Sequence, residues 1–458
     1  MKNFQLSELP PNAHIHMVGI GGISMSALAR MLRYFGYNVT GSDRTETKIT
    51  KSLSDDGFKI TIGHNQDAVS DPELVCYTAA IPKDNPELVK ARSLNIPVME
   101  RAELLGQLMK KYKFPVAVAG THGKTTTTSM LSLVLLEAGL DPTILVGGEL
   151  SQIGGNYKLG KDDYLVFEAC EYVESFLHFN PFLSVITNVE EDHLDYFTDL
   201  NHIISAFQKF TRLNSPDGCI IVCSDDKNCQ TLVQNSDRKV VKYGLISKNN
   251  DFFAENIEVK ENGRTTFDVY AYGEKVTEIS LFMPGKHNIL NALGAFAAAW
   301  QLGVEVDAIK RGLESYMGTK RRFEKLGETH GFTVIDDYAH HPTEIESCLN
   351  AAKSVATGDV WCVFQPHTYS RTKAFTDDFA KALSLADKTI IADVYPAREI
   401  YDGTIHSCDI AIRMKNSVYI NNFDAIERYL LQNVKEGDLV ITMGAGDIFK
   451  LGYKLVEK

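Results

Sequence analysis

The residues best suited to chemistry form a short loop near position 120. Residues 115–119 are apolar, and the chain continues with Gly120-Thr121-His122-Gly123-Lys124-Thr125-Thr126. Two glycines let the backbone turn several N–H groups toward one anion, and a following helix adds its positive N-terminal end. The lysine can bind the terminal phosphates of a nucleotide, and the hydroxyl of the next threonine can coordinate magnesium. Val118 stands where the usual loop has its first glycine, so a shortened nucleotide-binding loop is predicted in preference to a simple glycine turn.

Acidic residues follow two further apolar runs of the same region. One run ends at Glu168, and the other leads to Asp192 and His193. Because the carboxyl ends of parallel strands meet at one edge of a sheet, these side chains are expected near Lys124. Carboxylate oxygens and one imidazole suit Mg²⁺ held between the protein and phosphates. A helix cap at Asp192 is the simpler alternative for that residue.

A second glycine-rich loop lies near the start of the chain. Gly19, Gly21 and Gly22 separate an apolar run from an amphipathic one, and Ser24 stands where a dinucleotide-binding loop has Gly or Ala. Asp43 ends the next apolar run, where such proteins contact a ribose. The pattern alone favours NAD, but a diphosphate resting on a helix N-terminus fits it equally.

The last part of the chain carries three polar motifs, each next to a predicted strand. They are KRRF at residues 320–323, DDYAHHPTE at residues 336–344 and FQPHTYSRT at residues 364–372. Arginines in such loops can hold anionic oxygens and so form a second wall of a substrate site. The residues are equally consistent with polar surface loops that contain proline and have no role in binding.

Composition limits the classes of protein that the chain can be. It has 458 residues, is 44% hydrophobic and has a formal net charge of −12. The length predicts two or three domains, and the charge disfavours nonspecific binding to nucleic acid or an anionic membrane. We expect neither a membrane span nor a secretion signal. The eight cysteines form no CxxC pair and lie mostly in apolar runs, so we expect reduced core thiols in a cytoplasmic protein.

The elements that must position these loops alternate between short apolar runs and amphipathic helices. This rhythm predicts an α/β protein with parallel sheets covered by helices. Residues 252–283 instead alternate apolar and polar side chains around ENG and YGE turns, which predicts antiparallel hairpins at a sheet edge. Breaks near residues 111 and 320 divide the chain into domains at 1–111, 112–319 and 320–458.

Together the motifs resemble the Mur ligase family over nearly the whole chain. The shared stretches are AGTHGKTTT, DHLDYF, GKHNILNAL, KRRFE, DDYAHHPTE and FQPHTYSRT. The initial VGIGGISMSALA and the last two motifs are most similar to the branch that adds L-alanine to UDP-N-acetylmuramate. The resemblance implies a Rossmann-like first domain for the UDP sugar and a P-loop ATPase-like central domain with an antiparallel edge. A Rossmann-like third domain would bind the amino acid.

The family's functional residues carry over onto matching positions of this chain. The resemblance implies catalytic roles for Lys124, Glu168, His193, His340 and Arg371, and a metal site of Thr125, Glu168 and His193. ATP would bind at Gly120, Thr121, His122, Gly123, Lys124, Thr125, Thr126, Asn288, Asn291, Arg322 and Asp337. The UDP sugar, in place of NAD, would bind at Gly19, Gly21, Gly22, Ser42, Asp43 and His64.

The implied reaction is the ATP-dependent joining of L-alanine to UDP-N-acetylmuramate through an acyl phosphate, with Mg²⁺, in peptidoglycan precursor synthesis. Several relatives carry a carbamylated lysine near the position of Phe207, but residues 194–208 contain no lysine. That absence fits the L-alanine-adding branch. The expected partners are these two small substrates, and the chain is expected to be a monomer or weak homodimer. The alternatives are a ligase that joins a preformed murein tripeptide to the same sugar, an NAD-dependent oxidoreductase, and a nucleotide sensor without turnover.

Overall fold

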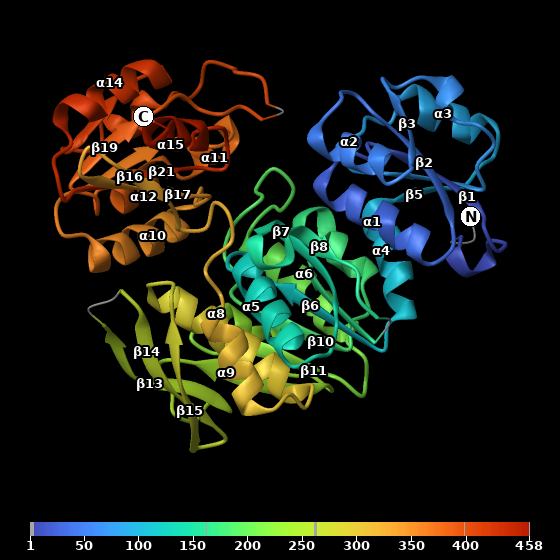
Figure 1. The fold of residues 1–458 in the computed structure, drawn as a ribbon, viewed down its shortest axis with the longest axis horizontal. Coiled ribbons are helices and arrows are strands. Elements are labelled where there is room, and N and C mark those ends of the chain that lie inside the picture. The colour runs from blue at the N-terminus through green and yellow to red at the C-terminus, as the bar shows by residue number, and fades with distance from the viewer. Residues whose placement is uncertain (1–3, 162, 261–262, 398, 458) are drawn as a thin grey trace.

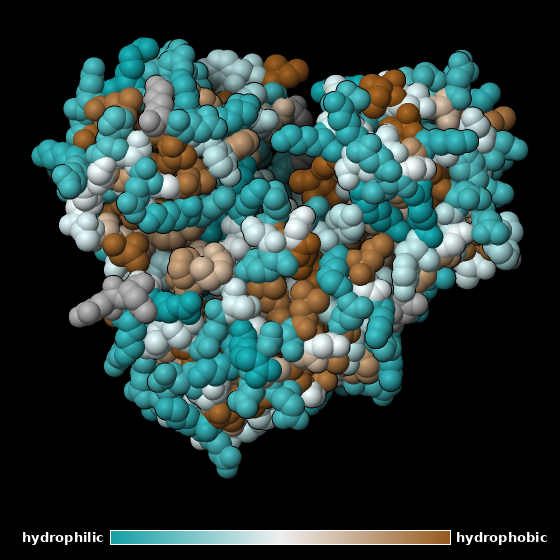
Figure 2. Space-filling model, in the orientation of Figure 1, coloured by the Kyte–Doolittle hydropathy of each residue, from teal (hydrophilic) through white to brown (hydrophobic). Residues whose placement is uncertain are grey.

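The computed structural model describes residues 4–161, 163–260, 263–397 and 399–457, which form three lobes, each built on its own sheet. In Figure 1 the first lobe (blue) and the third (orange to red) lie on either side of one end of the central lobe. Figure 2 shows a hollow between the first and third lobes. The expected α/β fold with three domains is confirmed.

The first lobe is a parallel five-stranded sheet in the order β3-β2-β1-β4-β5. Its strands are β1 (His14–Val18), β2 (Asn38–Asp43), β3 (Lys59–Ile62), β4 (Leu74–Tyr77) and β5 (Val98–Glu100). Its helices are α1 (Ile23–Tyr34), α2 (Lys48–Asp55), α3 (Pro86–Ser93) and α4 (Arg101–Leu108). The sequence analysis missed β3, a four-residue edge strand with no buried side chain and no continuous apolar run.

The central lobe is a ten-stranded sheet in the order β15-β14-β13-β12-β11-β10-β6-β9-β7-β8. Its first strands are β6 (Phe114–Ala119), β7 (Thr143–Leu150), β8 (Gly155–Lys158), β9 (Tyr164–Glu168) and β10 (Leu183–Ile186). The others are β11 (Cys219–Cys223), β12 (Lys239–Gly244), β13 (Phe252–Val259), β14 (Thr265–Ala271) and β15 (Glu274–Leu281). The predicted antiparallel hairpins are β13–β15, and β7 and β8 form a second antiparallel edge that was not predicted.

Five helices accompany the central sheet: α5 (Lys124–Glu137), α6 (Leu200–Arg212), α7 (Lys227–Leu232), α8 (Lys286–Gln301) and α9 (Val306–Glu314). α5 is buried on nearly all sides, because α8 and α9 pack against it on the sheet. That burial fixes the helix whose N-terminus carries the loop at residues 120–123. No helix in the described part of the chain has both the length and the apolar character needed to cross a membrane.

The third lobe is a six-stranded sheet in the order β16-β17-β21-β18-β19-β20, with only the β16–β17 pair antiparallel. Its strands are β16 (Glu324–Thr329), β17 (Phe332–Asp337), β18 (Val360–Phe364), β19 (Lys388–Ile391), β20 (Ser417–Tyr419) and β21 (Leu439–Met443). Its helices are α10 (Pro342–Val355), α11 (Tyr369–Ala374), α12 (Thr376–Leu383), α13 (Cys408–Ala411), α14 (Phe423–Asn433) and α15 (Phe449–Val456).

All eight cysteines are free thiols, and six of them lie in the core as predicted. Cys170 and Cys408 are partly exposed, and the other six are buried. Burial raises the pKa of the Cys76 thiol to about 12 and that of the Cys219 thiol to about 11, so both are un-ionised at neutral pH.

Candidate active site between the central and third domains

The predicted phosphate loop connects β6 to α5. Gly120 (φ 132°) and Gly123 (φ 81°) both adopt backbone conformations that favour glycine. A Cβ on Gly120 would lie 2.0 Å from Oγ1 of Thr187, so the loop can approach β10 only with glycine there. Gly123 is the N-cap of α5, and the loop therefore presents the positive end of a buried helix.

Lys124 is held at the end of this loop by three oxygen acceptors. Its Nζ donates to the carbonyls of Gly120 and Thr121 and to Oε2 of Glu171 at 2.9 Å. Burial disfavours the ammonium, but the charge of Glu171 outweighs it and raises the pKa of Lys124. The lysine is therefore cationic, as its predicted role requires. Glu171 was not among the predicted site residues, although it lies three residues after Glu168.

Thr125 and Glu168 form the part of the predicted metal site that the structure joins directly. Oγ1 of Thr125 donates to Oε2 of Glu168 at 3.1 Å. His193 lies farther along, with Nε2 4.0 Å from Oε1 of Glu171 and 3.8 Å from Oδ2 of Asp192. A hydroxyl and carboxylates next to the phosphate loop fit Mg²⁺, which prefers oxygen ligands. The alternative role of Asp192 as a helix cap is wrong, because Asp199 caps α6.

A cavity of about 300 Å³ opens between the phosphate loop and the third domain. Predicted ATP residues line it from both sides: His122, Gly123, Thr126, Asn288 and Asn291 from the central domain, and Arg322 and Asp337 from the third. The cavity also contains residues that the sequence did not single out, namely Asp225, Tyr243, His287 and Glu344. The two asparagines lie on the first turns of α8, which places them against the loop.

Asp337 ends β17 and is held by backbone donors. Its Oδ2 accepts from the N–H of Phe323 and its Oδ1 from the N–H of Ala339, each at 2.7 Å. Burial, opposed by Arg322, raises the pKa of Asp337 to about 6, so the group is mostly ionised at pH 7. The two hydrogen bonds fix the turn that leads from β17 to the His340 segment.

His340, in the loop after β17, and Arg371, on α11 after β18, face the central domain. Nη2 of Arg371 donates to Oδ1 of Asp192 at 2.6 Å, across the domain boundary. Nδ1 of His340 lies 3.0 Å from the carbonyl of Tyr338, which assigns the proton to Nδ1 and leaves the lone pair on Nε2. Burial lowers the pKa of His340 to about 4, so this imidazole is neutral at pH 7.

Glu344, on the first turn of α10, contacts three basic side chains around the cavity. Its carboxylate lies 3.1 Å from Nδ1 of His122, 3.2 Å from Nδ1 of His340 and 3.9 Å from Nη1 of Arg322. Although burial opposes ionisation, these neighbours hold the pKa of Glu344 well below its usual range. Sequence reasoning placed Glu344 in a motif without a role, because its partners come from other parts of the chain.

The predicted UDP-sugar residues gather at the carboxyl end of the first sheet. Asp43 Oδ2 accepts from the N–H of Gly21 at 2.9 Å, and Gly22 is the N-cap of α1. Ser42 Oγ and His64 Nδ1 both contact the buried carboxylate of Glu87, each at 2.8 Å. Glu87 lies far from both in sequence and carried no signal that would have revealed it.

A smaller cavity of about 150 Å³ lies where the first domain meets the central one. Ser24 and Leu28 line it from α1, Arg101 lines it from α4, and Glu168 lines it from the end of β9. The cavity thus connects the start of α1, next to the glycine loop, with the predicted metal ligand.

Comparison with known proteins agrees with this arrangement along the whole chain. Three Mur ligase family models match in succession: "Mur ligase family, catalytic domain" over residues 14–113, "Mur ligase middle domain" over 118–299, and "Mur ligase, glutamate ligase domain" over 321–446. A UDP-N-acetylmuramate–L-alanine ligase of Acetivibrio thermocellus is 51% identical over 454 residues, which are 98% of this chain and 97% of that protein.

Solved structures show the same similarity in three dimensions. A UDP-N-acetylmuramate–alanine ligase from Thermotoga maritima superimposes with a TM-score of 0.80 at 33% identity, covering 97% of this chain and 98% of that one. A murein peptide ligase from Psychrobacter arcticus covers the same shares of the two chains with a TM-score of 0.73 and 27% identity.

Proposed function

The chain belongs to the Mur ligase family, and we propose that it joins L-alanine to the lactyl carboxylate of UDP-N-acetylmuramate through an acyl phosphate. ATP drives the reaction, which is a step of peptidoglycan precursor synthesis. Relatives that are 51% and 49% identical to this chain are named UDP-N-acetylmuramate–L-alanine ligases. The murein peptide ligase, which represents the alternative, is less similar in sequence and in structure.

The observation that carries the proposal is the shared cavity. Gly123 and Thr126 line it at the start of α5, on either side of Lys124 in the sequence, and Arg322, Asp337 and Glu344 line it from the third domain. A nucleotide bound there would have its phosphates at the N-terminus of α5 and its base near α8. Activation of a carboxylate by phosphoryl transfer needs such a cationic, positioned end for the terminal phosphate.

The chain's own residues supply most of the charge for the first step. A lactyl carboxylate oxygen attacks the γ-phosphorus of ATP, the bond to the bridging oxygen breaks and ADP leaves. Lys124 stabilises the negative charge on the phosphoryl group during this transfer. Thr125 and Glu168, with His193 beyond Glu171, would hold Mg²⁺, which neutralises phosphate charge when bound. The cavity between Ser24 and Glu168 offers the path by which a UDP sugar on the first domain would reach this point.

The second step is attack of the alanine amine on the acyl phosphate. Arg371 would bind the alanine carboxylate through its guanidinium, which Asp192 orients. His340 is neutral, so its Nε2 can accept a hydrogen bond from the attacking amine. Both residues belong to the third domain, and its closure over the central domain would exclude the water that hydrolyses acyl phosphates.

The division into 1–111, 112–319 and 320–458 assigns the UDP sugar, ATP and alanine to successive domains. We expect the chain to act as a monomer or weak homodimer. Eight free thiols fit a reducing compartment, which supports a cytoplasmic location.

The test is phosphate release in the presence of ATP, Mg²⁺, UDP-N-acetylmuramate and L-alanine. Turnover should need both co-substrates, and unchanged release on omitting either one would contradict ligase activity. Replacing L-alanine with the L-Ala-γ-D-Glu-diaminopimelate tripeptide tests the alternative. Faster turnover with the tripeptide than with alanine would favour the murein peptide ligase.

A further inference from the structure

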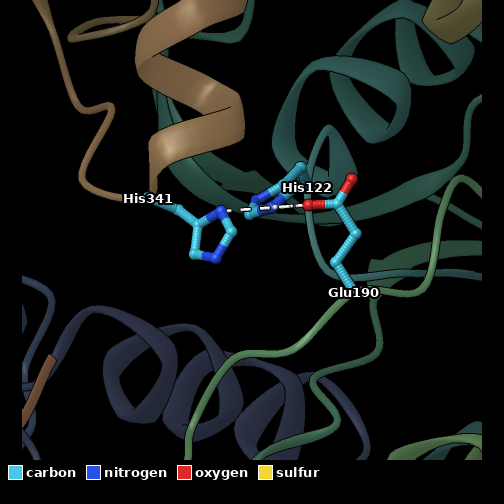
Figure 3. Close-up of side chains that lie close together, drawn as sticks. All are labelled: His122, Glu190 and His341. Carbon is cyan, nitrogen blue, oxygen red and sulfur yellow. Dashed lines mark ion pairs between the residues drawn. The ribbon is translucent and has the colours of Figure 1, made fainter. Parts of the chain in front are cut away.

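Two imidazoles and a carboxylate meet where the phosphate loop touches the third domain. His122 lies in the loop, Glu190 lies in the segment after β10, and His341 is the residue before α10. The possible ligand atoms of the three side chains all lie within 4.8 Å of one another. Figure 3 shows their ends converging from three separate segments. The proposed function gives Glu190 and His341 no role.

The two histidines are oriented as metal-binding histidines are. Nδ1 of His122 faces Oε1 of Glu344 at 3.1 Å, and Nε2 of His341 faces the carbonyl of Glu191 at 3.0 Å. Each outer nitrogen therefore donates its N–H to an oxygen, so in the neutral imidazole the lone pair lies on the inner nitrogen. The inner nitrogens, Nε2 of His122 and Nδ1 of His341, lie 3.4 Å and 3.9 Å from Oε2 of Glu190.

One of these inner nitrogens has no hydrogen-bond partner, although it lies 3.4 Å from Oε2 of Glu190. Among the described residues, Nε2 of His122 is buried and makes no hydrogen bond. Buried polar atoms are normally satisfied, so an unpaired one needs a ligand or an explanation. Nδ1 of His341 accepts a long hydrogen bond of 3.4 Å from the N–H of Thr343. Oε2 of Glu190 accepts a hydrogen bond from Oγ1 of Thr343, and a carboxylate oxygen can accept this bond and still bind an ion.

We propose that His122, Glu190 and His341 form a binding site for a divalent transition metal ion, best Zn²⁺, that bridges the central and third domains. Two imidazoles and one carboxylate are a common zinc ligand set, with water in the fourth position. Ligands about 2.0 Å from a tetrahedral ion are about 3.3 Å apart, so the observed spacing needs only small side-chain shifts. The oxygen-rich group of Thr125 and Glu168 suits Mg²⁺ instead.

Binding there has a mechanical consequence. His122 moves with the phosphate loop and His341 with α10, so one ion ties the two domains together. A proton competes with the ion: although burial disfavours it, Glu344 and Glu190 raise the pKa of His122 to about 9.

The test is Zn²⁺ binding to the full-length, chelator-treated protein in excess Mg²⁺, measured by calorimetry. Co²⁺ replaces Zn²⁺ in parallel, to report coordination by its visible absorption. The chain should bind one ion, with a four-coordinate Co²⁺ spectrum. His341→Asn keeps the helix cap while removing the imidazole, and Glu190→Gln removes the carboxylate. Each should weaken binding at least tenfold. The control is His406→Asn, which removes an imidazole that contacts Sγ of Cys408 and does not belong to the cluster. This variant should bind the ion as the parent does.

Several results would overturn the site. They are unchanged affinity in both His341→Asn and Glu190→Gln, an equal loss in His406→Asn, or a six-coordinate Co²⁺ spectrum. Circular dichroism verifies that each variant is folded. If one variant fails to fold, the other variant and the spectrum of the parent protein decide. None of these readouts depends on ligase activity, so the metal site and the proposed function fail separately.

Discussion

Replacing Asp192 with asparagine tests whether the central domain sets the position of Arg371. The two side chains join the central and third domains through a hydrogen bond of 2.6 Å, and they are only 8% and 11% exposed. The charge of Arg371 helps to hold the pKa of Asp192 below its usual range, so the bond is between two ions. Asparagine keeps the shape of the side chain but removes its charge and offers a donor in place of one acceptor.

The expected loss follows from the burial of the pair. A hydrogen bond to a charged group contributes about 1.5–3 kcal/mol, and a wholly unpaired buried charge costs about 3–5 kcal/mol. Asparagine can still accept one hydrogen bond from Arg371, so the expected loss is about 1.5–3 kcal/mol. At about 1.4 kcal/mol per factor of ten, kcat/KM for L-alanine should fall about 10- to 150-fold.

Steady-state kinetics with L-alanine varied, at saturating ATP and UDP-N-acetylmuramate, measures this loss. The KM for ATP should change little, because Asp192 and Arg371 lie outside the residues that line the 300 Å³ cavity. Asp199→Asn is the matched control, since it lies in the same segment and asparagine caps α6 equally well. A kcat/KM within threefold of the parent in Asp192→Asn, or an equal loss in Asp199→Asn, would refute the reasoning.

Three further outcomes are expected. Lys124→Met should lower kcat about 10²- to 10³-fold, as loss of one transition-state donor does, and a near-normal kcat in a folded variant would exclude Lys124 from the chemistry. Gly123→Ala should raise the KM for ATP at least tenfold, since its Cβ would lie 2.5 Å from Asn291 Oδ1 at φ 81°, and an unchanged KM would contradict this. Burial, only partly opposed by Glu344, lowers the pKa of His287 to about 4. The neutral form is therefore favoured by folding, and that stability is lost as pH falls from 6.5 to 4. Urea unfolding should show His287→Leu gaining up to about 3 kcal/mol on the parent over this interval, whereas a constant difference would disprove it.

The sequence predicted the loops of the site because each follows an apolar strand. Gly120–Thr126 follows β6, Glu168 ends β9, and the His340 segment follows β17. In parallel sheets such positions share one edge, so strand order need not be known to bring them together. Edge strands such as β3 escaped prediction, because partly exposed strands lack the apolar run that identifies buried ones.

The partners of the site residues could not be predicted in the same way. Glu171, Glu344 and Glu87 each neutralise or orient a predicted residue, yet a glutamate has no local pattern that separates a buried partner from a solvated one. Glu344 is separated by more than 200 residues in sequence from His122, so their contact exists only once two domains meet. Glu171 could have been predicted as a site residue, since it lies in the same segment at the end of β9 as Glu168.

These partners explain how a chain of net charge −12 can serve anionic substrates. Each cation of the site is held by a carboxylate: Lys124 by Glu171, Arg322 by Glu344, and Arg371 by Asp192. The free-energy cost of burying these cations is therefore offset by their carboxylate partners in the folded chain. We infer that a phosphate approaching Lys124 would displace Glu171, whose Oε1 lies 4.0 Å from Nε2 of His193. The same exchange would couple nucleotide binding to metal binding, because the carboxylate freed from the lysine lies where a cation can use it.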